Sequence, residues 1–193
     1  QYPGIGFYSD IFQLTPSTTR WVKRLASYGF VVAAPEIYYR IEPAGTVLEF
    51  DDEGKTRGQA DVDALTAAQF DEDITGTLEW LGGYSRVTSG PLGVAGHCTG
   101  GHIGFRAALS PAVAATALWY PTGLQNGKLG ADADAGSLDR ASAISGELLM
   151  IFGARDPHTS AAERAVVRAA LDAAGTTYEW AEFNAEHAFA RDV

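Results

Sequence analysis

The stretch that decides the fold reads Leu92-Gly-Val-Ala-Gly-His-Cys-Thr-Gly-Gly-His-Ile-Gly104. A short apolar run ends at Gly96, and two glycines after Cys98 open a helix-like segment. Glycines two positions before and after the cysteine permit a sharp turn from strand to helix, because side chains there would collide with both elements. Such a turn exposes the Cys98 thiol and aims the Thr99 backbone N–H and the helix N-terminus at a reacting carbonyl.

This pattern resembles the nucleophile elbow of the α/β-hydrolase fold, in which serine more often occupies the position of Cys98. The alternative interpretation is a buried structural cysteine that follows a glycine-rich turn. The rest of the chain has to supply the partners that a nucleophile needs, and these distinguish the two interpretations.

Length and composition favour one domain, residues 1–193, that is large enough to bury a sizeable core. The net charge of −10 argues against nucleic-acid binding, which requires a basic surface. The single cysteine demands no oxidising compartment, and no apolar run is long enough to span a membrane. We therefore expect a cytoplasmic protein with neither nucleic-acid nor membrane partners. The first residue is Gln1 rather than methionine, so the termini look trimmed.

Strand-like and helix-like segments alternate, which predicts a mostly parallel sheet with helices covering both faces. The polar stretch 40–59 predicts a mobile loop at the rim of a cleft, and 123–145 predicts a loop with room for a short helix. Helices are expected from Pro16 to near Gly29, over 61–81, over 101–109 and over 160–174. Strands are expected over 4–8, 30–34, 92–95, 113–120, 147–152 and 177–183.

Two residues at strand ends complete a candidate catalytic triad. A thiol that attacks an ester needs a base to deprotonate it and an acid to orient that base. In this fold the chain order is nucleophile, acid, histidine. Asp156 directly follows the strand 147–152 and His187 follows the strand 177–183, so both fit that order. Because ligands bind at the carboxyl ends of strands in such sheets, we expect Cys98, Asp156 and His187 to converge on one edge.

The acid and the base each have an alternative role. Asp156 could cap the helix that begins near Ser160, and His187 could be an ordinary surface histidine. The remaining histidines, at positions 97, 102 and 158, lack the chain position required of the base. No spacing typical of metal ligands occurs, so we do not expect a metal site.

The segment Gly96-His-Cys-Thr-Gly-Gly101, taken with Asp156 and the ending His187-Ala-Phe-Ala-Arg191, resembles the dienelactone hydrolase family. The resemblance extends over nearly the whole chain. It implies a cysteine hydrolase that opens enol-lactones during aromatic degradation through a Cys98–His187–Asp156 triad, without a cofactor.

The same resemblance assigns a role to the segment after the first strand. The family has a Glu-Ile-Phe-Gly motif there, and its glutamate interacts with the catalytic thiol. The matching stretch is Asp10-Ile-Phe-Gln13, so Asp10 inherits that role, whereas Glu36 matches a different family segment. Ile11 would supply the second oxyanion-hole N–H beside that of Thr99. The shorter acid, and a glutamine in place of glycine, leave the identity of the lactone open.

Family members hold the carboxylate of the substrate with two arginines. Arg191 matches one through the His-x-Phe-x-Arg spacing, and Arg57 is a looser match to the other, with a solvated loop arginine as its alternative. Phe12 and Tyr120 are expected to contact the substrate, although Tyr120 would serve equally well as a core or rim aromatic. Family members also carry more chain at both ends, including a final helix, so this chain is expected to be incomplete or exposed on one face.

Together these features predict an α/β-hydrolase that acts on a small, anionic ester or lactone. The second interpretation is a general thiol carboxylesterase of the same fold with neutral substrates. A third, from another class, is a ligand-binding or redox-sensing relative that kept the elbow and lost turnover.

Overall fold

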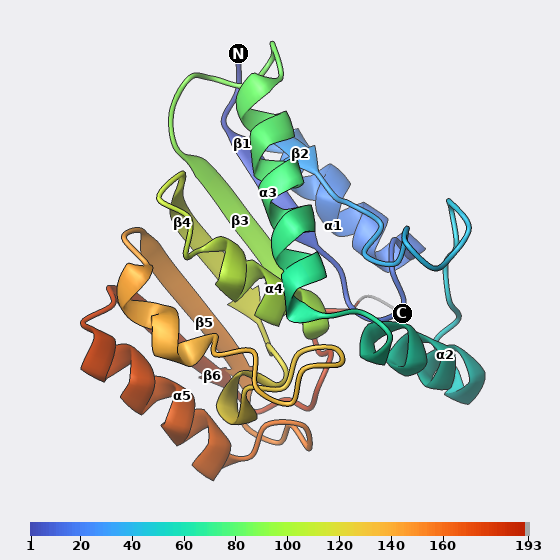
Figure 1. Cartoon of the computed structure of the whole chain (residues 1–193), viewed down its shortest axis with the longest axis vertical. Coiled ribbons are helices and arrows are strands. Elements are labelled where there is room, and N and C mark those ends of the chain that lie inside the picture. Colours follow the sequence, from blue (N-terminus) through green and yellow to red (C-terminus); the bar gives the residue numbers. More distant parts are fainter. Residues whose placement is uncertain (192–193) are drawn as a thin grey trace.

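The computed structural model describes residues 1–191 and contains one six-stranded sheet (Figure 1). Its strands are β1 (Gly4–Tyr8), β2 (Val31–Ala33), β3 (Leu92–His97), β4 (Val113–Trp119), β5 (Glu147–Gly153) and β6 (Tyr178–Phe183). Their order across the sheet is β2-β1-β3-β4-β5-β6, and every neighbouring pair is parallel. The predicted parallel sheet is therefore confirmed, and the carboxyl ends of its strands meet at one edge.

Five α-helices accompany the sheet within residues 1–191, and side-chain caps fix where several of them begin. The Thr15 hydroxyl accepts the Thr18 N–H at the start of the first helix, and Ser160 and Glu163 cap the last one reciprocally. None of the helices in the described chain is both long and apolar enough to cross a membrane. They are α1 (Pro16–Ser27), α2 (Asp52–Asp63), α3 (Ala67–Gly83), α4 (Thr99–Ala107) and α5 (Ala161–Ala174), with short 3₁₀ turns at Leu124–Asn126 and Leu138–Ala143.

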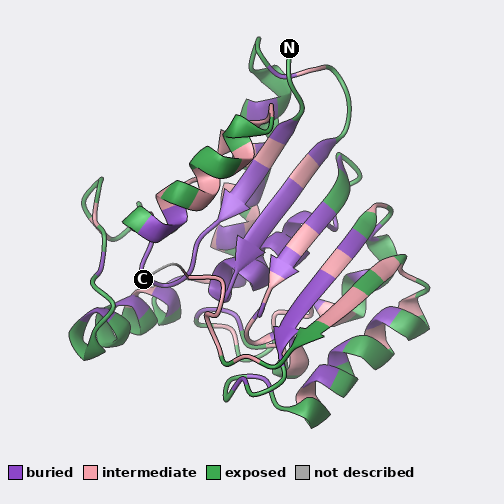
Figure 2. Cartoon of the chain, turned by 180° about the vertical axis from the view of Figure 1, so that it is seen from behind, coloured by how far each residue is buried: buried purple, intermediate pink, exposed green. Residues whose placement is uncertain are grey.

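Helices lie on both faces of the sheet, but they cover the faces unequally. On one face α3, α4 and α5 bury the apolar side chains of the central strands in two adjoining clusters. The other face carries α1 near β1 and β2, and Figure 2 shows the remaining strands open beside it. A groove of about 540 Å³ crosses these strands, from Leu25 of α1 to Tyr178 of β6. The predicted sheet with helices on both faces is therefore confirmed, and α1 leaves part of this face open, where several strand residues are small, as at Gly93, Ala115 and Ala117.

The segment between β2 and β3 differs most from expectation. Residues 52–63 form α2, although much of this stretch was expected to be a loop. The Asp51 carboxylate caps the helix by accepting the Gly54 N–H at 2.8 Å. The helix expected over 61–81 is instead divided, because a reciprocal capping box between Thr66 and Gln69 starts α3 afresh. Gly58 lets α2 lie close to the turn after β1, since a Cβ there would lie 2.4 Å from the Ile11 carbonyl oxygen.

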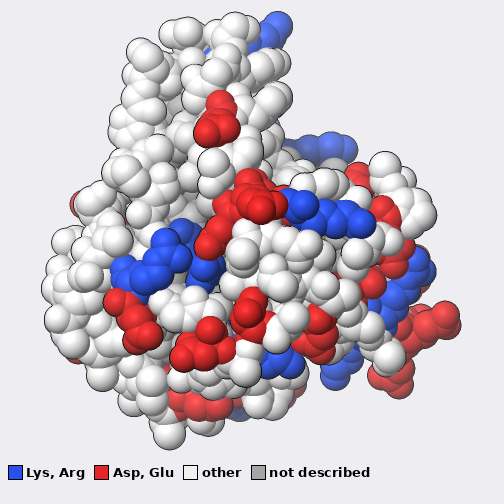
Figure 3. Space-filling view, in the orientation of Figure 1, with Lys and Arg blue, Asp and Glu red and all other residues white. Residues whose placement is uncertain are grey.

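Charged side chains are distributed unevenly over the face seen in Figure 3. Acidic and basic groups are interspersed over α2 and over the loops at the carboxyl ends of the strands, whereas the opposite end carries few. On this face no continuous basic surface forms.

Candidate active site

Cys98 lies on a strained turn between β3 and α4. Its backbone angles are φ 57° and ψ −125°, a conformation that side-chain-bearing residues rarely adopt. A Cβ at Gly96 would lie 2.3 Å from the Gly100 carbonyl oxygen, and one at Gly100 would lie 2.2 Å from the carbonyl oxygens of Tyr8 and Ser9. Both glycines are therefore required by close backbone approaches, as the sequence predicts for an elbow.

Asp156 and His187 come together at the same edge of the sheet. His187 Nδ1 lies 2.7 Å from Asp156 Oδ2, in a carboxyl side chain that is fully buried. The other Asp156 oxygen accepts the backbone N–H of His158 at 2.8 Å. Ser160 caps α5 by accepting the Glu163 N–H, so Asp156 is not the cap of that helix. Because Nδ1 of His187 is bonded to Asp156, its other ring nitrogen, Nε2, is available to the Cys98 thiol.

The protonation of this pair follows from its contacts. Burial works to lower the pKa of His187, but hydrogen bonds to Asp156 and to the Cys98 thiol outweigh it and raise that pKa to about 9. Burial likewise works to raise the pKa of the Asp156 carboxyl, and the bond from His187 holds that pKa below its usual value. A charged imidazolium between a carboxylate and a sulfur is the arrangement that favours a reactive thiolate.

Two aromatic rings hold the imidazole of His187. Tyr120 packs edge-on against it with ring centroids 4.9 Å apart, and His158 packs edge-on at 4.6 Å. Tyr120 also contacts the Phe189 ring and is only 2% exposed. The expectation that Tyr120 touches the substrate is therefore not supported, and its observed contacts are those of a core residue that positions His187.

Asp10 has other partners than the one expected. One carboxylate oxygen accepts the Phe12 backbone N–H at 3.0 Å, and the other accepts a hydrogen bond from Arg191 at 2.7 Å. His97 Nδ1 lies 3.6 Å from the same oxygen. The predicted contact with the Cys98 thiol is not among the bonds of Asp10. Asp10 is thus held by an ion pair with Arg191.

The two arginines expected to bind substrate are both engaged with carboxylates of the chain itself. Arg191 pairs with Asp10, and its guanidinium lies over the rings of Phe12 and Phe50 at 4.9 and 4.1 Å. Phe12 therefore packs on Arg191. Arg57 belongs to α2 rather than to a loop, and it binds Glu42 through Nε and Nη2 at 2.8 and 2.6 Å. Each guanidinium therefore gives part of its N–H donors to a carboxylate of the chain.

The proposed oxyanion donors lie at two adjoining chain turns. Thr99 is the first residue of α4, where backbone N–H groups have no partner inside the helix. In the turn after β1, the Asp10 side chain and backbone carbonyl accept the N–H groups of Phe12 and Gln13, and Ile11 N–H takes no part in these bonds. The tight contact of Gly100 with the end of β1 brings the two turns together.

A polar cavity of about 310 Å³ adjoins Thr99, and the sequence alone did not indicate it. Its walls are α2, the loop after β4 and the loop after β5. The loop after β4 is held by the buried His102, which hydrogen-bonds the Thr122 carbonyl and Ser137 Oγ at 3.0 and 2.7 Å. Burial lowers the pKa of His102 to about 3, so its ring is neutral. The lining residues are Gln59, Val62, Asp63, Thr99, Thr122, Gly123, Gln125, Asn126, Lys128, Leu129, Gly130 and His158.

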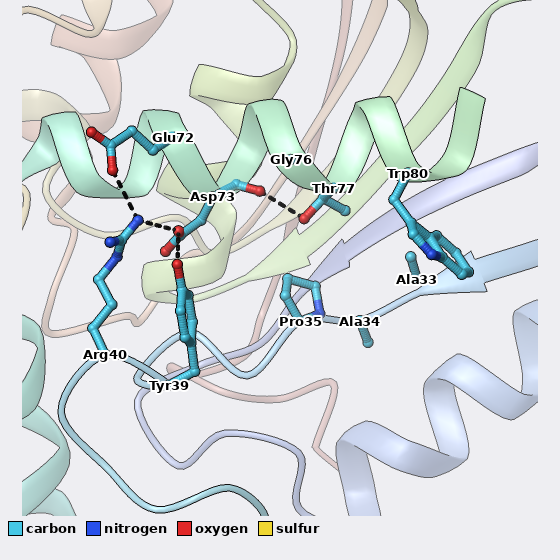
Figure 4. A pocket seen from close by; sticks show the side chains of 10 residues that line it. All are labelled: Ala33, Ala34, Pro35, Tyr39, Arg40, Glu72, Asp73, Gly76, Thr77 and Trp80. Atoms are coloured by element: carbon cyan, nitrogen blue, oxygen red, sulfur yellow. Dashed lines mark hydrogen bonds and ion pairs between the residues drawn. The ribbon is translucent and has the colours of Figure 1, made fainter. Parts of the chain in front are cut away.

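A second cavity, of about 460 Å³, lies between the end of β2 and α3 and contains none of the triad residues (Figure 4). At one end Arg40 contacts Glu72 and Asp73 at 3.0 and 2.7 Å, and the Tyr39 hydroxyl donates to Asp73 at 2.9 Å. Trp80 stands at the other end. Within residues 1–191, no group of three or more His, Cys, Asp or Glu side chains is placed to hold a metal ion.

Comparison with known proteins assigns the chain to a family. A model described as the dienelactone hydrolase family matches residues 1–193. A Saccharomyces cerevisiae protein named "Putative carboxymethylenebutenolidase" is 32% identical, over the whole of this chain and 71% of its own length. A Synechocystis protein of the same name is 28% identical, over 89% of this chain and 68% of its own length. The chain belongs to the dienelactone hydrolase family, whose members hydrolyse ester and lactone bonds.

Solved structures agree on the fold. A crystal structure described as a "Putative Dienelactone Hydrolase" from Klebsiella pneumoniae superposes with a TM-score of 0.77 at 24% identity, covering 97% of this chain and 76% of that one. A "Dienelactone Hydrolase-like" phosphotriesterase from metagenomic libraries gives 0.76 at 20% identity, covering 97% and 72%. These likenesses show the α/β-hydrolase fold, as the elbow motif predicts.

Proposed function

We propose that this protein hydrolyses a small lactone or ester with Cys98 as nucleophile, His187 as base and Asp156 as the acid that orients the base. The observation that supports this most strongly is the chain of contacts from Asp156 through His187 to a thiol on a strained elbow. We further propose that residues 1–193 act as one catalytic domain. The free thiol of the single cysteine favours a reducing compartment, so we propose that it acts in the cytoplasm.

The proposed reaction proceeds through a thioester. The Cys98 thiolate attacks the lactone carbonyl carbon, and the backbone N–H groups of Ile11 and Thr99 stabilise the resulting oxyanion. The ring C–O bond then breaks, and the departing oxygen takes a proton from His187. Neutral His187 next removes a proton from a water molecule, which attacks the thioester. The C–S bond breaks, the ring-opened acid leaves, and Cys98 is again a thiolate beside a protonated His187.

A lactone that carries a carboxylate is the substrate class we propose. Two curated relatives bear the name carboxymethylenebutenolidase, which denotes a carboxylated lactone as substrate. The polar cavity beside Thr99 has the size of a small molecule of that kind. One observation favours the alternative, a carboxylesterase for neutral esters: Arg57 and Arg191 are both paired with carboxylates of the chain.

The test is a hydrolysis screen over dienelactones, simple lactones and p-nitrophenyl esters. Cys98→Ala should abolish hydrolysis and preserve the fold. Cys98→Ser should retain at most a small fraction of the wild-type activity, because a hydroxyl is far less acidic than a thiol. Faster turnover of carboxylated lactones than of neutral esters supports the proposed substrate class. Undiminished turnover by Cys98→Ala would exclude the mechanism.

A further inference from the structure

The cavity beside Thr99 adjoins one of the proposed oxyanion donors and a histidine that contacts the proposed catalytic base. Thr99 and His158 both line it, and the ring of His158 contacts that of His187. A substrate whose carbonyl reaches Cys98 can therefore place a neighbouring substituent in this cavity. The groups that line the cavity then decide which substituents are accepted.

His158 is held in the cavity wall by its backbone. Its N–H donates to Asp156 Oδ1 at 2.8 Å, and its carbonyl accepts from Gln125 Nε2 at 3.5 Å. Its ring stands at 74° to the ring of His187. Among residues 1–191 no side chain or backbone group hydrogen-bonds either ring nitrogen of His158. The ring is thus oriented by its packing, and its polar edge is available to a ligand.

Three charged groups face this ring from three different elements: Asp156 from its own loop, His187 from the loop after β6, and Lys55 from α2. Burial and the charge of His187 lower the pKa of His158, with a smaller contribution from Lys55 and an opposing one from Asp156. The ring is therefore neutral at neutral pH and carries one N–H.

Lys55, which faces His158, has no carboxylate partner within the described residues. It lies one helical turn before Gln59, on the face of α2 that lines the cavity. Lys128 also lines the cavity, but it pairs with Asp63 at 3.1 Å. The charge left uncompensated beside His158 is therefore positive.

We propose that His158 is a specificity-determining residue, which donates a hydrogen bond from its ring to a carboxylate substituent of the lactone while its ring holds His187 in place. This inference rests on the proposed function and specifies the part of the site that recognises the substrate. Lys55 attracts the same carboxylate through its charge. The assignment places a contact for the anion in the cavity between α2 and the loop after β5, apart from Arg57 and Arg191.

The test measures binding in a Cys98→Ala background, so that it does not depend on turnover. The ligands are two lactones that differ at one position: γ-butyrolactone-γ-carboxylate, and γ-valerolactone, which has a methyl group there. His158→Phe keeps a ring against His187 and removes the donor, and His158→Gln keeps a donor. Calorimetry gives the ratio of the two dissociation constants for each protein.

We expect His158→Phe to reduce the preference for the carboxylated lactone about tenfold, the usual loss for one hydrogen bond to a charged group. His158→Gln should restore part of the preference, and Arg57→Gln should leave the ratio unchanged. An unchanged ratio in His158→Phe, or a wild-type ratio near one, would overturn the proposal. Loss of the preference in Arg57→Gln would show that Arg57 binds the carboxylate of the lactone instead. Hydrolysis by the intact protein, measured separately, tests the proposed function itself.

Discussion

Arg191 donates a hydrogen bond to Asp10 across 2.7 Å, although 181 residues separate the two in the chain. The pair joins the turn after the first strand to the last residues that the structure describes. Asp10 is almost fully buried and Arg191 mostly so, with side-chain exposures of 2% and 18%. Because Asp10 also accepts the Phe12 N–H, this contact fixes the turn that presents the Ile11 N–H.

Breaking this ion pair should destabilise the protein. Arg191→Met and Asp10→Asn should each lower the free energy of unfolding by about 2 kcal/mol, because each leaves a mostly buried partner without its counter-charge. The double variant should lose clearly less than the sum, as residues in one ion pair couple. Urea denaturation of the four proteins measures this. Strictly additive losses would mean that the two side chains contribute independently.

The stability that His187 contributes should depend on pH. Its folded-state pKa is about 9, above the unfolded value of about 6.5. Its interactions therefore stabilise the fold fully below pH 6.5, and this contribution is lost as the pH rises through about 9. The stability difference between wild type and His187→Gln should shrink by about 3 kcal/mol from pH 6 to pH 9.5. A difference that stays constant over this range would contradict the prediction.

Asp156→Asn should reduce both turnover and thiol reactivity. The amide cannot stabilise the imidazolium, so kcat should fall roughly 10²- to 10⁴-fold, and iodoacetamide should alkylate Cys98 about tenfold more slowly at pH 7. Asp139→Asn, at an exposed aspartate of a 3₁₀ turn, is the matched control and should match wild type in both assays. Alkylation as fast as in wild type would show that Asp156 does not affect the reactivity of the Cys98 thiol.

Two helical glycines should respond in opposite ways to alanine. Gly58→Ala places a Cβ 2.4 Å from the Ile11 carbonyl oxygen, so α2 or the Ile11 turn must move. We expect a loss of about 1–3 kcal/mol in stability and at least about a tenfold fall in kcat, because a proposed oxyanion donor is displaced. Gly76→Ala meets nothing within 4 Å and should stabilise α3 by about 0.5–1 kcal/mol. An unchanged kcat in Gly58→Ala would argue against Ile11 as a donor.

The features that could be predicted from the sequence are those that a local pattern of residues determines, namely the elbow and the strand-end positions of Asp156 and His187. The glycines around Cys98 specify the elbow because they are needed within five residues of one another. Asp156 and His187 were predictable as neighbours because each directly follows a strand of a parallel sheet, which leads them to the same edge. In these cases the order of residues along the chain and the positions of the strand ends are sufficient to predict which side chains lie together.

The remaining contacts depend on partners that no local pattern reveals. Arg57 finds Glu42 and Arg191 finds Asp10, so two arginines assigned to a substrate carboxylate are paired with carboxylates of the chain. The charged start of α2 looked like a loop because its stability comes from a cap at Asp51 rather than from an apolar stripe. The recognition role of His158 depends on a cavity formed by three separate segments, and only the tertiary structure brings these together.

The positive φ of Cys98 sets the proposed catalysis and folding in competition at one residue. Glycine would adopt this turn without steric penalty, so a chain selected only for robustness would drop the side chain on which the chemistry depends. Cys98→Gly should therefore be inert yet melt at a higher temperature than wild type. Directed evolution for heat resistance that omits an activity screen would select against the proposed nucleophile, so this position has to be excluded from mutagenesis in such a search.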